Sequence, residues 1–165
     1  MQAIFNPDEQ LSEHFKLGEF LRSATAEKLG IPNIPLKRDI TALQSLCMRC
    51  LEPMRQRLGL PIQVTSGYRC PRLNDAVKGV QTSQHLRGEA ADITIPRLSR
   101  PFGHATDEQT ALLLYSYAKQ YADFDQLILE HSGSSYWLHV SCRIDYRKNR
   151  HEKLKMDNGK YTRID

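Results

Sequence analysis

Three side chains that commonly bind metals, His85, Asp92 and His139, occur where a folded chain could bring them together. Asp92 lies in residues 89–95 and His139 in residues 136–142, and both segments alternate between apolar and other residues as strands do. In each strand the alternation places the metal-binding type of side chain on the face opposite the apolar residues. His85 precedes Asp92 by seven residues, in a polar loop.

Two imidazoles and one carboxylate suit a catalytic zinc ion, which takes three protein ligands and keeps one position for water. The bound water becomes acidic and so supplies a nucleophile near neutral pH. A single histidine or aspartate on a polar strand face is more often solvated or hydrogen-bonded than metal-bound. Strand phase alone therefore leaves both interpretations open.

The residues around His85 and Asp92 also resemble a known signature. The segment from Ser83 to Asp92, SQHLRGEAAD, fits the S-x-H-x-x-G-x-A-x-D pattern of the M15 family of zinc D-Ala-D-Ala peptidases at all five specified positions. Two flanking blocks follow the order of that family: SGYR at residues 66–69 and WLH at residues 137–139. The early segment FKLGEF, residues 15–20, resembles the leader helix of the carboxypeptidase branch. The resemblance covers about residues 11–145 and implies the small fold that hedgehog signalling domains share with these peptidases.

The resemblance implies roles for individual residues. His85, Asp92 and His139 would bind one zinc ion, and Ser83 would lie behind them and orient a ligand or the loop. Arg69 would face the substrate, where a guanidinium suits either a terminal carboxylate or the oxyanion that develops at the scissile carbonyl.

The general base is less directly indicated. Some branches of the family carry a glutamate three residues before the last histidine ligand, but this chain has Tyr136 there. We predict Glu130 as the base, because it ends the preceding strand on its polar phase and a hairpin could bring it beside the metal. His131, expected in the following loop, is the alternative. Trp137 could form an apolar wall for the substrate or pack at the edge of the core.

Helical patterns come first and strands joined by turns follow, which predicts an α+β fold with a small antiparallel sheet flanked by helices. We expect one domain with a helical part (about residues 11–58), a catalytic core (about 61–145) and a basic tail (146–165). The long amphipathic helix over residues 37–58 should kink or stop at Pro53. Cys47 and Cys50 lie on its apolar stripe, so we expect buried free thiols.

Composition limits the class of protein. The chain has 165 residues, a formal net charge of +4 and no apolar run long enough to span a membrane. We therefore expect no binding to nucleic acid or membrane, and we also expect a monomer. The N-terminus lacks the pattern of a signal peptide. This favours synthesis in the cytoplasm, and a phage or prophage protein would act on the cell wall after release.

Taken with the resemblance, these observations predict zinc-dependent hydrolysis of the stem peptide of peptidoglycan by a D-Ala-D-Ala carboxypeptidase. Two alternatives stay open. One is a cell-wall endopeptidase like the endolysins of phages, and the other is a non-catalytic module that keeps the zinc fold and binds the wall.

Overall fold

The computed structural model describes residues 5–165. The first four residues, on which the expectation of no signal peptide partly rests, lie outside this range. The helices are α1 (Leu17–Leu21), α2 (Ala24–Leu29), α3 (Lys37–Leu46), α4 (Glu52–Leu58), α5 (Pro71–Ala76) and α6 (Asp107–Tyr121). The strands are β1 (Gln63–Ser66), β2 (Ala90–Thr94), β3 (Gln126–Ser132), β4 (Ser135–Ser141), β5 (Glu152–Asp157) and β6 (Lys160–Arg163).

The six strands form one sheet in the order β1-β2-β4-β3-β5-β6, so the predicted α+β class is confirmed. The sheet is larger than predicted and mixed, because β3 and β5 run parallel while the other neighbours are antiparallel. The reason lies in the connection after β4. Ser141, at the end of β4, pairs with Gln126 at the start of β3, and Glu152 at the start of β5 pairs with Gln126 from the other side. After β4 the chain therefore passes the end of the sheet at which β3 begins. Because β5 starts at that same end and pairs with β3, it runs in the same direction as β3.

Strands β5 and β6 lie in the segment that was expected to be a basic tail. They form a hairpin around Asn158 and Gly159, whose φ angles of 46° and 91° are the positive values that a tight hairpin turn requires. Leu154 and Met156 alternate with Lys153 and Lys155 in β5. The Asn-Gly pair and this alternation are the sequence signals that predict the hairpin.

Pro53 interrupts the long N-terminal helix without ending it. A π-helical turn, Cys47–Leu51, joins α3 to α4 just before the proline. Proline has no N–H to donate, and the carbonyl of Arg49, four residues earlier, instead accepts a hydrogen bond of 3.0 Å from the backbone N–H of Asp123. Cys47 and Cys50 are buried free thiols, as predicted.

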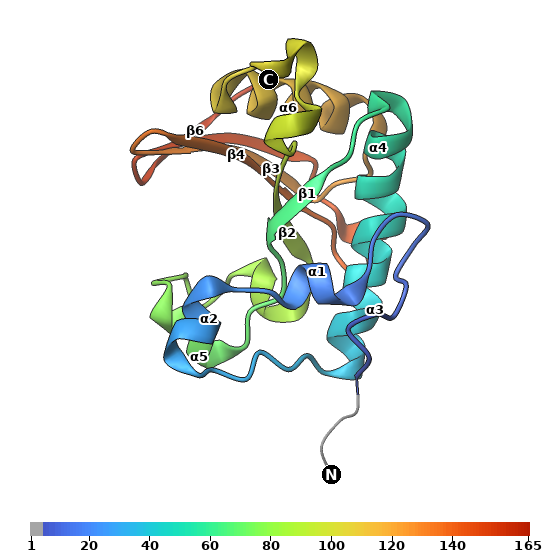
Figure 1. Ribbon diagram of the computed structural model, residues 1–165, viewed down its shortest axis with the longest axis vertical. Coiled ribbons are helices and arrows are strands. Elements are labelled where there is room, and N and C mark those ends of the chain that lie inside the picture. The colour runs from blue at the N-terminus through green and yellow to red at the C-terminus, as the bar shows by residue number, and fades with distance from the viewer. Residues whose placement is uncertain (1–4) are drawn as a thin grey trace.

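The helical core covers one face of the sheet. Ile93 in β2 and Leu138 and Val140 in β4 are fully buried in a core shared with α3, α4 and α6. In Figure 1, α6 lies above the sheet, α3 and α4 run down one side, and α1, α2 and α5 gather below. In the described part of the chain, no helix has the length and apolar composition needed to cross a membrane.

Candidate metal centre

The sheet register brings Asp92 and His139 directly opposite each other. Asp92 in β2 pairs with His139 in β4, and Ile128 in β3 pairs with His139 from the other side. Residues paired in this way point to the same face. Because Leu138 and Val140 occupy the core face of β4, Asp92 and His139 share the face away from the helical core, as the alternation predicts.

His85 reaches the same point from a short 3₁₀ turn, Gln84–Arg87, that ends at Gly88. Gly88 has a φ of +67°, and a Cβ atom there would collide with the carbonyl oxygen of Asp39. Both the backbone conformation and the close approach therefore require glycine. The N–H of Arg69 donates to the carbonyl of His85 at 3.1 Å, which fixes the turn against the segment that follows β1.

The three candidate ligands present their donor atoms as a small triangle. His85 Nε2 lies 3.3 Å from His139 Nδ1 and 3.3 Å from Asp92 Oδ1, and His139 Nδ1 lies 3.0 Å from Asp92 Oδ1. Ligand atoms that surround one zinc ion tetrahedrally lie about 3.3 Å from one another. The triangle therefore has the dimensions that one zinc ion requires.

The hydrogen bond at the other ring nitrogen of His85 agrees with this fit. Its Nδ1 atom lies 2.7 Å from the carbonyl oxygen of Gly67. A carbonyl can only accept, so in the neutral ring Nδ1 carries the proton and Nε2 presents its lone pair to the triangle. Sequence reasoning assigned the orienting role to Ser83, but a backbone carbonyl fills it for His85. Within the described residues, no side-chain hydrogen bond links Ser83 to the three candidate ligands, although Ser83 lines the same cavity.

Asp92 is buried yet stays ionised. Without a metal, burial alone would raise the pKa of its carboxyl, but the positive charge and N–H groups of protonated imidazoles at His85 and His139 hold that pKa well below its usual range. Its second oxygen, Oδ2, accepts a hydrogen bond of 3.1 Å from Nη2 of Arg69. Arg69 in turn donates from Nε to Ser66 Oγ at 3.1 Å. The arginine expected to face the substrate thus also orients a candidate metal ligand, a contact that its motif did not reveal.

Glu130 lies beside the triangle. Its Oε1 atom is 4.0 Å from Nδ1 of His139, and its neighbour across the strands is Trp137. Burial, and to a smaller extent the negative charge of Asp92, raise the pKa of Glu130 to about 7. A carboxyl with such a pKa can accept a proton and return it at neutral pH.

His131 is placed differently from the expectation. It belongs to β3 and not to a loop, and the alternation of the strand turns it away from the face that carries Glu130. Its ring nitrogens contact Asp157 Oδ1 at 2.9 Å and the carbonyl of Gly133 at 2.8 Å, and its ring stacks on Tyr136. The structure therefore brings Glu130, and not His131, to the candidate ligands.

A cavity of about 710 Å³ contains the site. It lies between the sheet and the loop around residues 78–88, and the three candidate ligands, Arg69, Glu130, Ser83 and Trp137 all line it. Sequence reasoning missed the part of the wall that comes from the connection between β4 and β5 and from β5 and β6 themselves. Those residues include Arg143, Arg150, Leu154 and Tyr161.

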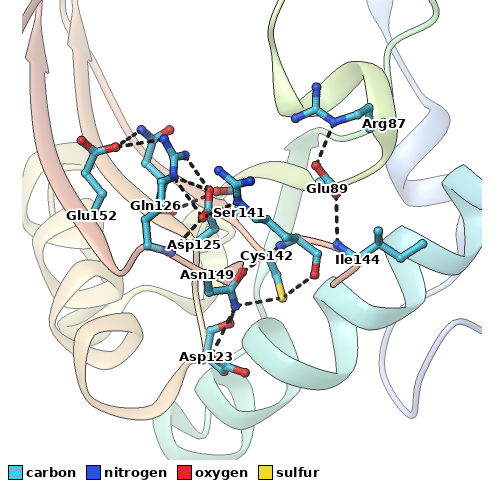
Figure 2. Close-up of polar contacts among 12 residues, drawn as sticks. Arg87, Glu89, Asp123, Asp125, Gln126, Ser141, Cys142, Ile144, Asn149 and Glu152 are labelled. Carbon is cyan, nitrogen blue, oxygen red and sulfur yellow. Dashed lines mark hydrogen bonds and ion pairs between the residues drawn. The ribbon is translucent and has the colours of Figure 1, made fainter. Parts of the chain in front are cut away.

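A buried carboxylate, Asp125, supports this end of the cavity and is labelled in Figure 2 near Gln126 and Ser141. Asp125 is fully buried and accepts hydrogen bonds from Arg143 Nε at 2.8 Å and from Arg150 Nη2 at 2.6 Å. Burial alone would raise the pKa of Asp125, but the hydrogen bonds from Arg150 and Arg143 outweigh it and lower that pKa to about 2.

This pKa predicts a pH dependence of stability. A carboxyl whose pKa is lower in the folded state stabilises the fold above its unfolded pKa of about 4, and the contribution disappears as the pH falls towards 2. Between pH 5 and 2 the wild type should therefore lose up to about 2 kcal/mol of unfolding free energy through Asp125. Urea denaturation at both pH values should show a smaller loss for Asp125→Asn, whereas Asp75→Asn, at an exposed aspartate, should behave as the wild type. An equal loss in wild type and Asp125→Asn would contradict this assignment.

Comparison with known protein families gives a match. A family model described as Peptidase M15 matches residues 13–141, which include all three candidate ligands, Arg69 and Glu130. A search of curated proteins found none that matches the chain.

Proposed function

The chain belongs to the M15 peptidase family, a family of zinc-dependent metallopeptidases, and we propose that it hydrolyses peptidoglycan stem peptides as a D-Ala-D-Ala carboxypeptidase. The observation that carries the proposal is the triangle of His85 Nε2, Asp92 Oδ1 and His139 Nδ1. The distances between these three atoms suit binding of one zinc ion, and the triangle lies within a cavity. A partly buried carboxyl group beside the triangle supports catalysis in preference to binding alone.

Each residue has a task in the proposed reaction. Bound zinc would polarise the scissile carbonyl and lower the pKa of a water molecule. Glu130 accepts the proton of the attacking water at its carboxylate and returns it to the leaving amine. Arg69 keeps Asp92 in place through Nη2, and its positive charge favours the negative oxygen that develops during attack. Trp137, which pairs with Glu130, supplies an apolar wall beside the reacting group.

One observation favours a second candidate within the same chemistry. The cavity continues past the candidate ligands to Gln126 and Arg143, and on to Leu154 in β5. A terminal dipeptide needs only the part next to the metal ligands, whereas an extended wall peptide would use the remainder. Cleavage of an internal bond, as by an endopeptidase, is therefore the alternative to release of a terminal residue.

The test is hydrolysis of synthetic wall peptides by the zinc-loaded protein, with products identified by mass spectrometry. We expect release of terminal D-Ala from a pentapeptide stem and loss of that activity after treatment with a chelator. Internal fragments from a cross-linked peptide would identify an endopeptidase instead. Binding of wall peptides without any cleavage by the zinc-loaded protein would overturn the proposal in favour of a binding module.

A further inference from the structure

We propose that Arg143 is a specificity-determining residue that binds a carboxylate of the peptide substrate several residues away from the scissile bond. This rests on the proposed function, because it concerns the substrate of the same cavity. Arg143 lies outside the residues that match the family model and lines the cavity together with the three candidate ligands.

A hydrogen bond from Nε orients the side chain of Arg143, which remains partly exposed. Its Nε atom donates to Asp125, which is fully buried, and 37% of the Arg143 side chain is exposed. Within the described residues, neither Nη atom of Arg143 has a hydrogen-bond partner, so two charged donors are free at the cavity wall. Arg150 differs, because its guanidinium contacts both Asp125 and Glu152.

The backbone of Arg143 is fixed on both sides. The N–H of Cys142 donates to the carbonyl of Glu89 at 2.9 Å, and the N–H of Ile144 donates to Glu89 Oε1 at 3.0 Å. The N–H of Arg143 itself donates to Asn149 Oδ1 at 3.0 Å. Figure 2 shows Glu89 against Ile144 and Asn149 beside Cys142. The guanidinium is therefore held in position before a ligand arrives, which lowers the entropic cost of binding.

The charge of the cavity also favours an anion. Among its lining residues, five are cationic and two are acidic. The two acidic side chains, Asp92 and Glu130, belong to the candidate metal centre, so Arg143 meets no acidic side chain from the cavity wall outside that centre. A carboxylate accepts two parallel hydrogen bonds from the Nη atoms of an arginine, which makes it the ligand that this geometry suits.

The spacing from His139, in β4, to Arg143, two residues beyond the end of β4, indicates where that carboxylate would be. Arg143 follows His139 by four residues, a path of about 13 Å in extended chain. A peptide that lies extended in the cavity covers a similar path in three or four residues. We therefore expect preference for an acidic residue at the third or fourth position from the cleaved bond.

Matched peptides test this preference. The panel carries glutamate or glutamine at the third or fourth position on either side of one cleavable bond. At one of these positions the wild type should show a kcat/KM about tenfold higher for the glutamate peptide. Arg143→Gln should bring that ratio close to one, and Arg143→Lys, which keeps the charge but cannot bind in bidentate fashion, should give an intermediate ratio. Arg147→Gln, at an exposed arginine paired with Asp145, is the control and should keep the wild-type ratio.

Two outcomes separate failure of this inference from failure of the proposed function. Equal cleavage of both peptides of every pair by the wild type would overturn the role of Arg143 while leaving the peptidase intact. If no peptide is cleaved, calorimetry on zinc-loaded Glu130→Gln still tests binding. Glutamate peptides that bind about tenfold more tightly than their glutamine partners, with the difference lost in Glu130→Gln/Arg143→Gln, would support the carboxylate site without the peptidase. If Arg143→Gln fails to fold, the glutamate-to-glutamine ratios of kcat/KM for the wild type and for Arg143→Lys still test the proposal.

Discussion

Glu130→Gln is expected to lower kcat for peptide hydrolysis by about 10²- to 10⁴-fold. Glutamine keeps the shape of the side chain but cannot accept a proton from water, so the loss should appear in the chemical step and not in substrate binding. Because Glu130 is not one of the three donors of the triangle, zinc content should stay at that of the wild type.

The measurement combines steady-state kinetics with zinc analysis of the same preparation. Glu108→Gln is a suitable control, since Glu108 is an exposed glutamate in the first turn of α6. Its kcat should equal that of the wild type. Full activity in Glu130→Gln with a normal zinc content would show that another group takes the proton.

His139→Ala is expected to weaken zinc binding by about 10³-fold and to abolish hydrolysis with it. The side chain supplies one of three protein donors, and a structural zinc site gains roughly 10–16 kcal/mol from all of its ligands together. His139 also lies between Asp92, which is already a candidate ligand, and Ile128, which has no ligand atom, so neither of its paired residues can replace it.

Competition with a chromophoric chelator would measure this affinity in wild type and variant. His104→Ala is the matched control, because His104 is exposed and lies outside the cavity that holds the candidate ligands. Thermal unfolding of the metal-free proteins would separate loss of a ligand from loss of the fold. Wild-type affinity in a folded His139→Ala protein would remove His139 from the ligand set.

The sequence predicts the side chains of the site better than their surroundings. Strand alternation alone places Asp92, Glu130 and His139 on the polar phase of their strands, and the structure has all three on one face of the sheet. This works because the two-residue period of a strand is local and needs no knowledge of which strands pair.

The missed features depend on contacts between distant parts of the chain. The carbonyl of Gly67 orients His85, but a backbone carbonyl has no residue type that a motif could record. Arg143 is oriented in the cavity wall by Asp125, 18 residues earlier, which accepts a hydrogen bond from its Nε atom. The parallel pairing of β5 with β3 follows from the crossing after β4, which local propensity does not encode. The β5–β6 hairpin, in contrast, carried a local signal at Asn158 and Gly159.

We expect His85, Asp92 and His139 together to hold the one zinc ion on which peptide hydrolysis depends. The most direct test is to titrate zinc into metal-free wild-type protein while following both bound metal and cleavage of a wall peptide. We predict that activity rises in proportion to bound zinc and levels off at about one ion per chain. Full cleavage by the metal-free protein, or bound zinc without any gain in activity, would contradict the account.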